Sequence, residues 1–291
     1  MMFSGCFVAL VTPFSNGKVD KEGLKSLVEF HIKEGIDGIV PCGTTGESAT
    51  LSMDEHKEVV ELVIEYVGGR IPVIAGAGSN NTLEALELTR FAKKAGASAV
   101  LSITPYYNKP TPSGLYEHYR TISSEVDIPI ILYNIPSRTG INMSPETIKK
   151  ISEIENVVGV KEASGDLKQV SEIIRLCGED FTVLSGDDFI ILPLMAVGGK
   201  GVISATANVA PRDMTNMIKE FNKGNISEAR RLHYKLLPLC KAMFIETNPG
   251  PVKAALSMMG KISEEIRLPL VKVREDTREK IKKALIEYGL I

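Results

Sequence analysis

A lysine at the end of a short apolar run is the residue of this sequence best suited to covalent chemistry. Residues 157–160 are apolar or glycine, Lys161 follows them directly, and a helix is expected to start at Ser164 or Asp166. The run predicts a buried strand, which places the amine of Lys161 at the mouth of a buried site. Burial disfavours the charged form of an amine, and a neutral amine can attack a carbonyl carbon to form a Schiff base. The alternative is a lysine that simply reaches solvent where its strand ends.

Hydroxyl, phenol and guanidinium groups follow several other apolar runs, where they are suited to assist a carbonyl reaction. Phenol and threonine hydroxyls can relay protons while a carbinolamine forms and loses water. A Gly-Thr-Thr-Gly turn can offer backbone N–H groups and hydroxyls to a carboxylate, and the planar fork of an arginine can bind a second carboxylate. The residues concerned are Thr44, Thr45, Tyr106, Tyr107, Tyr133 and Arg138. Their shared position after apolar runs predicts a common site.

Each of these groups also has a purely structural interpretation. The turn at residues 43–46 is typical of a tight loop, and adjacent tyrosines such as those at 106–107 often serve packing. An arginine in a Pro-Ser-Arg-Thr-Gly segment is most often a solvated surface charge. The carboxylates of Glu47, Asp187 and Asp188 are expected to cap the helices that follow them rather than to bind Mg²⁺.

Eight short apolar runs alternate along the chain with longer amphipathic segments, which predicts eight strand-helix pairs. The expected strands cover residues 7–11, 38–42, 72–76, 99–103, 129–133, 156–161, 181–185 and 201–204. The expected helices cover residues 20–33, 53–67, 82–95, 113–125, 166–177, 189–197 and 212–223, with one more starting at Ser144. Strands that are apolar throughout indicate a parallel sheet covered by helices.

Eight such pairs predict an α/β fold, the (β/α)₈ TIM barrel, whose active sites lie at the carboxyl ends of the strands. A doubly wound open sheet is the alternative, but it usually carries a Gly-x-Gly-x-x-Gly turn after an early strand, and this sequence has none. The last part of the chain lacks strand-like alternation and predicts three helices. We therefore expect a catalytic barrel domain at residues 1–225 and a C-terminal helical domain at residues 226–291.

Composition argues against several classes of partner. The formal net charge is −2, aromatic residues make up 6% and tryptophan is absent, which disfavours binding to nucleic acid or to an anionic membrane surface. No stretch approaches the ~20 apolar residues of a membrane span. The first apolar run lacks a preceding basic segment and is short for a signal peptide, so a cytoplasmic location is expected. The histidines and cysteines are widely spaced, and no metal site is expected.

Three motifs carry a resemblance to a known family. Residues 43–47 (Gly-Thr-Thr-Gly-Glu), 133–140 (Tyr-Asn-Ile-Pro-Ser-Arg-Thr-Gly) and 159–166 (Gly-Val-Lys-Glu-Ala-Ser-Gly-Asp) resemble those of the dihydrodipicolinate synthase family, in the same order over essentially the whole chain. The resemblance implies a lyase that condenses pyruvate with L-aspartate 4-semialdehyde on the route to diaminopimelate and lysine. It implies no cofactor beyond the Schiff base itself.

The resemblance also implies roles for single residues. Lys161 would form the pyruvate Schiff base, and Tyr133, Thr44 and Tyr107 would form a proton relay. The equivalent of Tyr107 reaches into the neighbouring subunit's site in the family, which implies a homotetramer built as a dimer of dimers.

Substrate binding would fall to a second group of residues. The resemblance assigns the pyruvate pocket to Thr45, Ile203 and Gly186, and the carboxylate of the incoming aldehyde to Arg138. Many family members are inhibited by lysine, and the matching positions here are Ser48, Ala49, His56, Asn80, Glu84 and Tyr106. Met53 stands where one group of inhibited relatives carries a histidine, so lysine inhibition stays open.

Two other functions are compatible with part of this pattern. Another Schiff-base pyruvate aldolase, such as an N-acetylneuraminate lyase or a keto-deoxy-sugar aldolase, would keep Lys161 and Tyr133 but would not need Arg138. A non-catalytic barrel that binds a keto acid would form no covalent adduct at Lys161.

Overall fold

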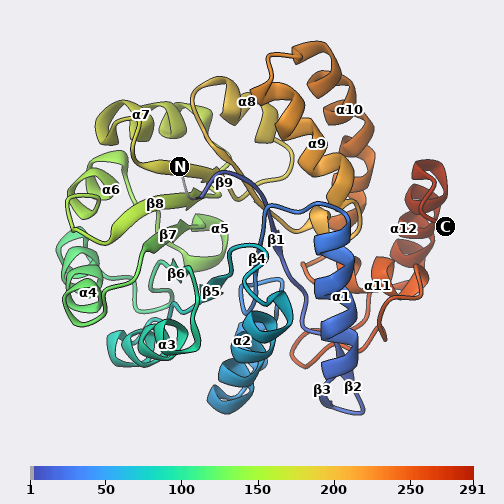
Figure 1. Ribbon diagram of the computed structural model, residues 1–291, viewed down its shortest axis with the longest axis horizontal. Coiled ribbons are helices and arrows are strands. Elements are labelled where there is room, and N and C mark those ends of the chain that lie inside the picture. Colours follow the sequence, from blue (N-terminus) through green and yellow to red (C-terminus); the bar gives the residue numbers. More distant parts are fainter. Residues whose placement is uncertain (1–2) are drawn as a thin grey trace. The chain divides into compact units, whose positions relative to one another are not determined.

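The computed structural model describes residues 3–291, in which strands and helices alternate along the chain (Figure 1). The chain forms two compact units. Unit 1 comprises the described residues up to Gly5 and Val73–Ile203, and unit 2 comprises Cys6–Pro72 and Ser204–Ile291. Met1 and Met2, the first residues of the segment tested above for a signal peptide, lie outside the described residues. The domain boundary between residues 225 and 226 stays a prediction.

Unit 1 contains six strands, each followed by a helix except the last. Its strands are β5 (Ile74–Gly76), β6 (Ala99–Ile103), β7 (Ile130–Asn134), β8 (Val157–Glu162), β9 (Thr182–Ser185) and β10 (Gly201–Ser204). Its helices are α3 (Thr82–Ala95), α4 (Pro112–Glu125), α5 (Pro136–Thr139), α6 (Pro145–Ile151), α7 (Leu167–Cys177) and α8 (Ile191–Ala196). The short helix α5 was not expected, and it places Arg138 in a helical turn.

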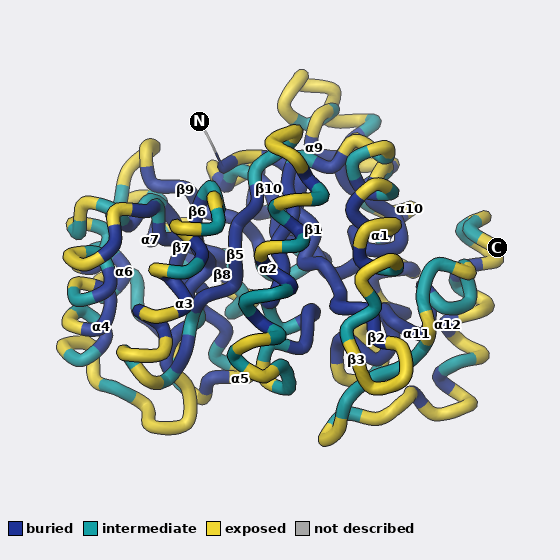
Figure 2. Tube along the Cα trace, turned by 60° about the horizontal axis from the view of Figure 1, so that its bottom comes forward, coloured by how far each residue is buried: buried dark blue, intermediate teal, exposed yellow. Residues whose placement is uncertain are grey.

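The strands of unit 1 form a parallel array in the order β10-β9-β8-β7-β6-β5. Their residues are nearly all buried, as the dark strands of Figure 2 show, while the outward faces of α3 and α4 are exposed. This burial on both faces agrees with strands that are apolar throughout. Parallel pairing brings the carboxyl ends of all six strands to one edge of the array.

Polar caps fix where the helices of unit 1 begin. The side chains of Asn81, Thr111, Ser144 and Asp166 each accept a hydrogen bond from a backbone N–H in the first turn of α3, α4, α6 and α7, respectively. These bonds satisfy donors that have no partner inside the helix. Ser144 and Asp166 are thus the helix starts that the sequence predicts.

Unit 2 combines an N-terminal part, Cys6–Pro72, with the C-terminal part of the chain, Ser204–Ile291. Its N-terminal part holds β1 (Gly5–Ala9), β2 (Phe14–Ser15), β3 (Lys18–Val19), α1 (Lys21–Lys33), β4 (Gly38–Val40), η1 (Ser48–Thr50) and α2 (Met53–Val67). Its C-terminal part holds η2 (Thr206–Asn208), α9 (Pro211–Asn222), α10 (Ile226–Met243), α11 (Gly250–Met258) and α12 (Glu275–Tyr288). β1 and β4 pair in parallel from Phe7 to Ala9.

The first strand and the hairpin after it differ from the expectation. The strand ends at Ala9 rather than at residue 11, and β2 and β3 form an antiparallel hairpin that was not expected. The turn of the hairpin is Asn16-Gly17, and both residues have positive φ, at 53° and 78°. An Asn-Gly pair with this geometry is the preferred two-residue hairpin turn, so the signal was present in the sequence. The three helices expected after residue 225 are present as α10, α11 and α12.

A histidine buried in α1 predicts how stability depends on pH. His31 has no exposed surface, and neither ring nitrogen has a hydrogen-bond partner. Burial, with a smaller effect of the Lys261 charge, lowers the pKa of His31 from 6.5 to about 3. Because the folded pKa is depressed, the unfolded chain binds the proton first, and stability is lost as pH falls from about 6.5 toward 3.

Replacing this histidine should therefore flatten the acid limb of the stability profile. For His31→Leu, we expect the free energy of unfolding between pH 6.5 and 4.5 to fall less steeply than in the wild type, by up to about 1.4 kcal/mol per pH unit. Urea unfolding at several pH values measures this difference. Equal slopes for the two proteins would show that His31 does not titrate in this way.

No helix within residues 3–291 is long and apolar enough to cross a membrane.

Candidate active site

Lys161 and Tyr133 lie side by side at the carboxyl ends of β8 and β7. They are register partners in the parallel pairing of these strands, so their side chains point to the same face. The Lys161 Nζ atom lies 4.3 Å from the centre of the Tyr133 ring. Both side chains are buried, with relative exposures of 6% and 5%. The structure thus brings together two of the residues that the sequence analysis placed in the relay and the Schiff base.

The next residue on each strand faces the other way and fastens the strand ends together. Asn134 and Glu162 are also register partners, and the Asn134 amide donates to the Glu162 carboxylate at 2.9 Å. The same carboxylate accepts hydrogen bonds from the Ser164 backbone N–H at 2.7 Å and from the Gln169 amide at 3.2 Å. Glu162 is therefore engaged away from Lys161, as the alternation of side chains along a strand predicts. This buried network holds the positions of Lys161 and Tyr133.

Two further groups shape the surroundings of the pair. The Thr104 hydroxyl donates to the Tyr133 carbonyl at 2.8 Å and so ties the end of β6 to β7. Gly186 follows β9, and a Cβ atom built there would lie 3.0 Å from Lys161 Cε. It would lie even closer, at 2.6 Å, to the Cβ atom of Ala163, so Gly186 adjoins Lys161 at a position that is too crowded for a side chain. Ile203 is buried in β10.

Arg138 and Tyr107 lie on exposed segments of unit 1. Arg138 is exposed in α5, which Gly140 closes with a φ of 75°. Tyr107 is 88% exposed and has a φ of 69°, a left-handed conformation that is uncommon for a bulky residue. Such backbone strain is often retained at functional sites. Within residues 3–291, no hydrogen bond or ring contact joins Tyr107 to Tyr133.

Thr44 and Thr45 lie in unit 2, in the loop between β4 and η1. Backbone hydrogen bonds from Gly46 to the Gly43 carbonyl and from Glu47 to the Thr44 carbonyl, both 3.1 Å, close this loop tightly. The Thr12 hydroxyl donates to the Gly46 carbonyl at 2.7 Å. Thr45 is buried, whereas Thr44 is half-buried. The turn interpretation and the binding interpretation are thus compatible, because a rigid turn can present hydroxyls.

The expectation that Glu47 caps a helix is wrong. Glu47 precedes η1, but its side chain makes no capping hydrogen bond. It forms an ion pair with Lys253 of α11 instead, and both side chains are almost wholly buried. Burial lowers the pKa of Lys253, and the charge of Glu47 opposes that shift. Glu47 is therefore committed to a long-range contact with the C-terminal helices.

The expectation that Asp187 caps the following helix is also wrong, whereas the capping role of Asp188 stays a prediction. The Asp187 carboxylate accepts a hydrogen bond from the Phe189 backbone N–H at 2.9 Å, which makes a turn before α8 begins. The residue that precedes α8 is Ile190, without a side-chain capping bond. Among residues 3–291, no group of three or more histidine, cysteine, aspartate or glutamate side chains is placed to hold a metal ion.

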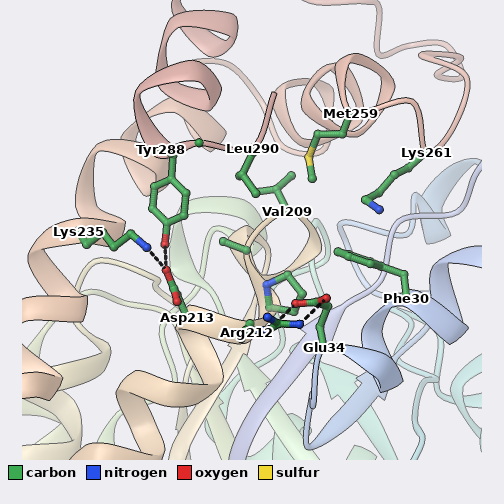
Figure 3. A pocket seen from close by; sticks show the side chains of 13 residues that line it. Phe30, Glu34, Val209, Arg212, Asp213, Lys235, Met259, Lys261, Tyr288 and Leu290 are labelled. Carbon is green, nitrogen blue, oxygen red and sulfur yellow. Dashed lines mark hydrogen bonds and ion pairs between the residues drawn. The ribbon is translucent and has the colours of Figure 1, made fainter.

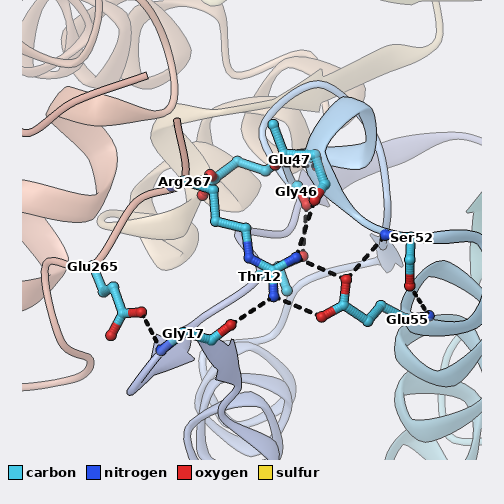
Figure 4. A network of polar contacts seen from close by, with 9 residues as sticks. Thr12, Gly17, Gly46, Glu47, Ser52, Glu55, Glu265 and Arg267 are labelled. Atoms are coloured by element: carbon cyan, nitrogen blue, oxygen red, sulfur yellow. Dashed lines mark hydrogen bonds and ion pairs between the residues drawn. The ribbon is translucent and has the colours of Figure 1, made fainter. Parts of the chain in front are cut away.

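The loop of the two threonines is fastened by residues that the sequence analysis did not single out. Arg267 donates to both oxygens of Glu55, at 2.8 and 2.6 Å, and to the carbonyls of Thr50 and Gly17 (Figure 4). Its backbone N–H donates to Glu47 at 3.1 Å. The Asn248 amide donates to the Thr45 hydroxyl at 2.9 Å. These partners lie 203 to 250 residues apart in sequence, so no local sequence pattern predicts the contacts between them.

The residues matched to a lysine-inhibition site are divided between the units. Ser48, Ala49 and His56 lie in unit 2. In unit 1, the Glu84 carboxylate accepts a hydrogen bond from the Ser79 hydroxyl at 2.8 Å, and the Asn80 carbonyl accepts one from Asn108 at 2.9 Å. Burial raises the pKa of Tyr106, with a smaller contribution from Glu84.

A pocket of about 320 Å³ in unit 2 contains none of the predicted site residues (Figure 3). Its acidic groups already have partners within the pocket. Glu34 pairs with Arg212 at 2.9 Å, and Asp213 binds both Lys235 and the Tyr288 hydroxyl at 2.6 Å. These contacts fasten the C-terminal helix α12 and helix α10 to α9.

The chain is similar over nearly its whole length to proteins of one known family. A family model described as the dihydrodipicolinate synthetase family matches residues 2–288. The 4-hydroxy-tetrahydrodipicolinate synthase of Syntrophus aciditrophicus (strain SB) is 58% identical over 290 residues and is covered in full, as is this chain. The crystal structure of dihydrodipicolinate synthase from Aquifex aeolicus is 50% identical, with a TM-score of 0.98 and 99% of each chain covered. The chloride-inhibited enzyme from Acinetobacter baumannii, crystallised with pyruvate, is 46% identical, with a TM-score of 0.97 and 99% of each chain covered.

The fold is a TIM barrel, with parallel strands alternating with helices and further helices at the C-terminus. This confirms the expected fold class. The chain belongs to the dihydrodipicolinate synthetase family, as the resemblance of its three motifs predicted.

Proposed function

We propose that Lys161 forms the Schiff base with pyruvate in this enzyme. The observation that carries the proposal is the buried lysine at the end of β8, with its Nζ atom 4.3 Å from the ring of the register partner Tyr133. The amine attacks C2 of the keto acid, and the carbinolamine then loses water to give the imine. Loss of a proton from the methyl carbon gives an enamine, whose carbon attacks the aldehyde of the second substrate.

The chain is a 4-hydroxy-tetrahydrodipicolinate synthase, an enzyme of lysine biosynthesis. L-Aspartate 4-semialdehyde is the proposed second substrate. After the new carbon–carbon bond has formed, the amino group of the semialdehyde attacks the imine carbon, which closes the ring and frees Lys161. Membership of this family argues against the sugar-cleaving aldolases and the non-catalytic barrel.

Proton transfer falls to hydroxyl groups in this mechanism. We assign the relay to Tyr133, Thr44 and Tyr107. The ring of Tyr133 lies against the lysine side chain, so its hydroxyl belongs to the same site as the carbinolamine. Tyr107 is 88% exposed, which is compatible with a phenol that serves the site of a neighbouring subunit. We therefore propose a homotetramer that is built as a dimer of dimers. We also propose that the enzyme functions in the cytoplasm.

Substrate binding is assigned by position and chemistry. Thr45 would bind the pyruvate carboxylate, with Gly186 and Ile203 lining the pocket. The absence of a side chain at Gly186 leaves room beside Lys161. Arg138 would bind the carboxylate of the semialdehyde through its planar guanidinium. Lysine binding at the residues around Glu84 stays a prediction.

Replacing Arg138 separates the two half-reactions. For Arg138→Ala, we expect adduct formation with pyruvate to persist, while condensation falls by about 100-fold, or about 2.7 kcal/mol of transition-state binding, because only the second substrate loses a partner. The measurements are borohydride trapping with mass spectrometry and the rate of condensation with the semialdehyde. Arg120→Ala, at an exposed arginine paired with Glu117, is the matched control.

The outcome also tests which aldehyde the site accepts. If Arg138→Ala retains full condensation, the assigned role is wrong. If the wild type turns over N-acetylmannosamine or glyceraldehyde and leaves the semialdehyde unreacted, the proposed second substrate is wrong.

A further inference from the structure

The hydroxyl of Thr45 is held by a side chain from the far end of the sequence. Asn248, just before α11, donates its amide N–H to Thr45 Oγ1 at 2.9 Å. Both residues are buried, with relative exposures of 6% and 3%. This bond is the one interaction of the Thr45 hydroxyl within the part of the chain that the structure describes.

The direction of this bond determines what the hydroxyl can do. A threonine hydroxyl has one proton to donate and two lone pairs that accept. Since a lone pair of Thr45 Oγ1 is occupied by the Asn248 N–H, the hydroxyl proton remains to be donated elsewhere. An acceptor in place of the amide nitrogen would instead attract that proton. The amide of Asn248 thus leaves Thr45 oriented as a donor, which is what a bound carboxylate requires.

The same C-terminal segment also fixes the other side of the loop. Five residues beyond Asn248, Lys253 forms the buried ion pair with Glu47, two residues after Thr45. The Lys253 Nζ atom also lies 4.2 Å from the centre of the Phe14 ring and donates to the Glu265 carbonyl at 2.9 Å. Glu47 itself has a left-handed φ of 55°. The loop therefore has little freedom to rotate Thr45 away from Asn248.

We propose that Asn248 is a positioning residue that holds the Thr45 hydroxyl as a hydrogen-bond donor to the carboxylate of the keto-acid substrate. This inference rests on the proposed role of Thr45 in binding pyruvate. In this proposal, Asn248 acts on the reaction through its hydrogen bond to the Thr45 hydroxyl. The C-terminal helices thereby contribute to substrate affinity.

The test is a double-mutant cycle on the full-length enzyme. Asn248→Asp keeps the shape of the side chain but replaces the donor with an acceptor, which turns the Thr45 proton toward residue 248. We expect the KM for pyruvate to rise about tenfold or more, with a smaller change in kcat, because a uniform binding interaction is lost. Asn248→Ala removes the donor without supplying an acceptor and should raise the KM less.

Asn248→Asp is also made in a Thr45→Val background. This comparison separates the effect on the Thr45 hydroxyl from the effect of the added negative charge. If Asn248 acts through the hydroxyl, Asn248→Asp should raise the KM little further in Thr45→Val, which lacks the hydroxyl. The same rise in both backgrounds, or an unchanged KM in a folded Asn248→Asp enzyme, would overturn the inference. Circular dichroism monitors folding, and if Asn248→Asp does not fold, the cycle is completed with Asn248→Ala. If Thr45→Val itself leaves the KM for pyruvate unchanged, the proposed role of Thr45 fails instead.

Discussion

Replacing Lys161 with arginine is expected to abolish the condensation of pyruvate with aspartate 4-semialdehyde. Arginine keeps the positive charge and most of the length of the side chain, but its guanidinium stays protonated and cannot form an imine. The loss of a covalent route should lower kcat by at least about 1,000-fold, equivalent to about 4 kcal/mol. The rate is measured with both substrates at saturation, and borohydride trapping should find no pyruvate adduct.

A control variant makes this result specific. Lys168→Arg changes an exposed lysine of the same unit and should keep both the activity and the adduct. Lys161 is buried, and its Cε atom would lie only 3.0 Å from a Cβ atom built at Gly186. Because the side chain has so little space, the larger arginine head is expected to disturb the packing. Lys161→Ala, which creates no such crowding, should lose the adduct as well. An adduct that persists in Lys161→Ala would place the imine on another residue.

Removing the hydroxyl of Tyr133 is the second change with a large expected effect. Tyr133→Phe keeps the aromatic ring against which the Lys161 amine packs, so it removes a proton donor and acceptor while leaving the contact in place. General acid-base catalysis typically contributes 10²–10⁴-fold, and we expect kcat to fall within about that range. The adduct should still form, but slowly, because the carbinolamine loses water without its relay.

Tyr116 provides a matched control for the ring contact. The Lys150 Nζ atom lies 4.9 Å from the centre of the Tyr116 ring, in a similar pairing of lysine and phenol away from β7 and β8. Tyr116→Phe should leave kcat unchanged. If Tyr133→Phe condensed the substrates at the wild-type rate, the phenol would have no part in the relay and Tyr133 would serve packing alone.

The sequence predicts most of the fold because its signals are local. Alternating apolar runs and amphipathic segments mark the strands and helices, and the polar caps at Ser144 and Asp166 mark where two helices begin. Strand ends also predict which residues gather at one edge of a parallel sheet, and Lys161 and Tyr133 do lie together there. Their register pairing could not be predicted, since it depends on how β7 and β8 align.

The errors have a physical cause in contacts between distant parts of the chain. A glutamate after a Gly-Thr-Thr-Gly turn predicts a helix cap, but the carboxylate of Glu47 forms a buried ion pair with Lys253 instead. Removing one partner of such a pair is costly, so the long-range contact outweighs the local preference. The contact of Asn248 with Thr45 could not be predicted either, because a single asparagine before a proline is typical of any turn.

The central claim is that Lys161 carries the pyruvate, and peptide mapping of the trapped adduct tests it most directly. The wild-type enzyme is incubated with pyruvate, reduced with borohydride, digested, and analysed by tandem mass spectrometry. We predict one reduced pyruvate adduct per chain, located at Lys161, and none when pyruvate is omitted. An adduct at a different lysine, or no adduct in an enzyme that still condenses its substrates, would contradict the claim.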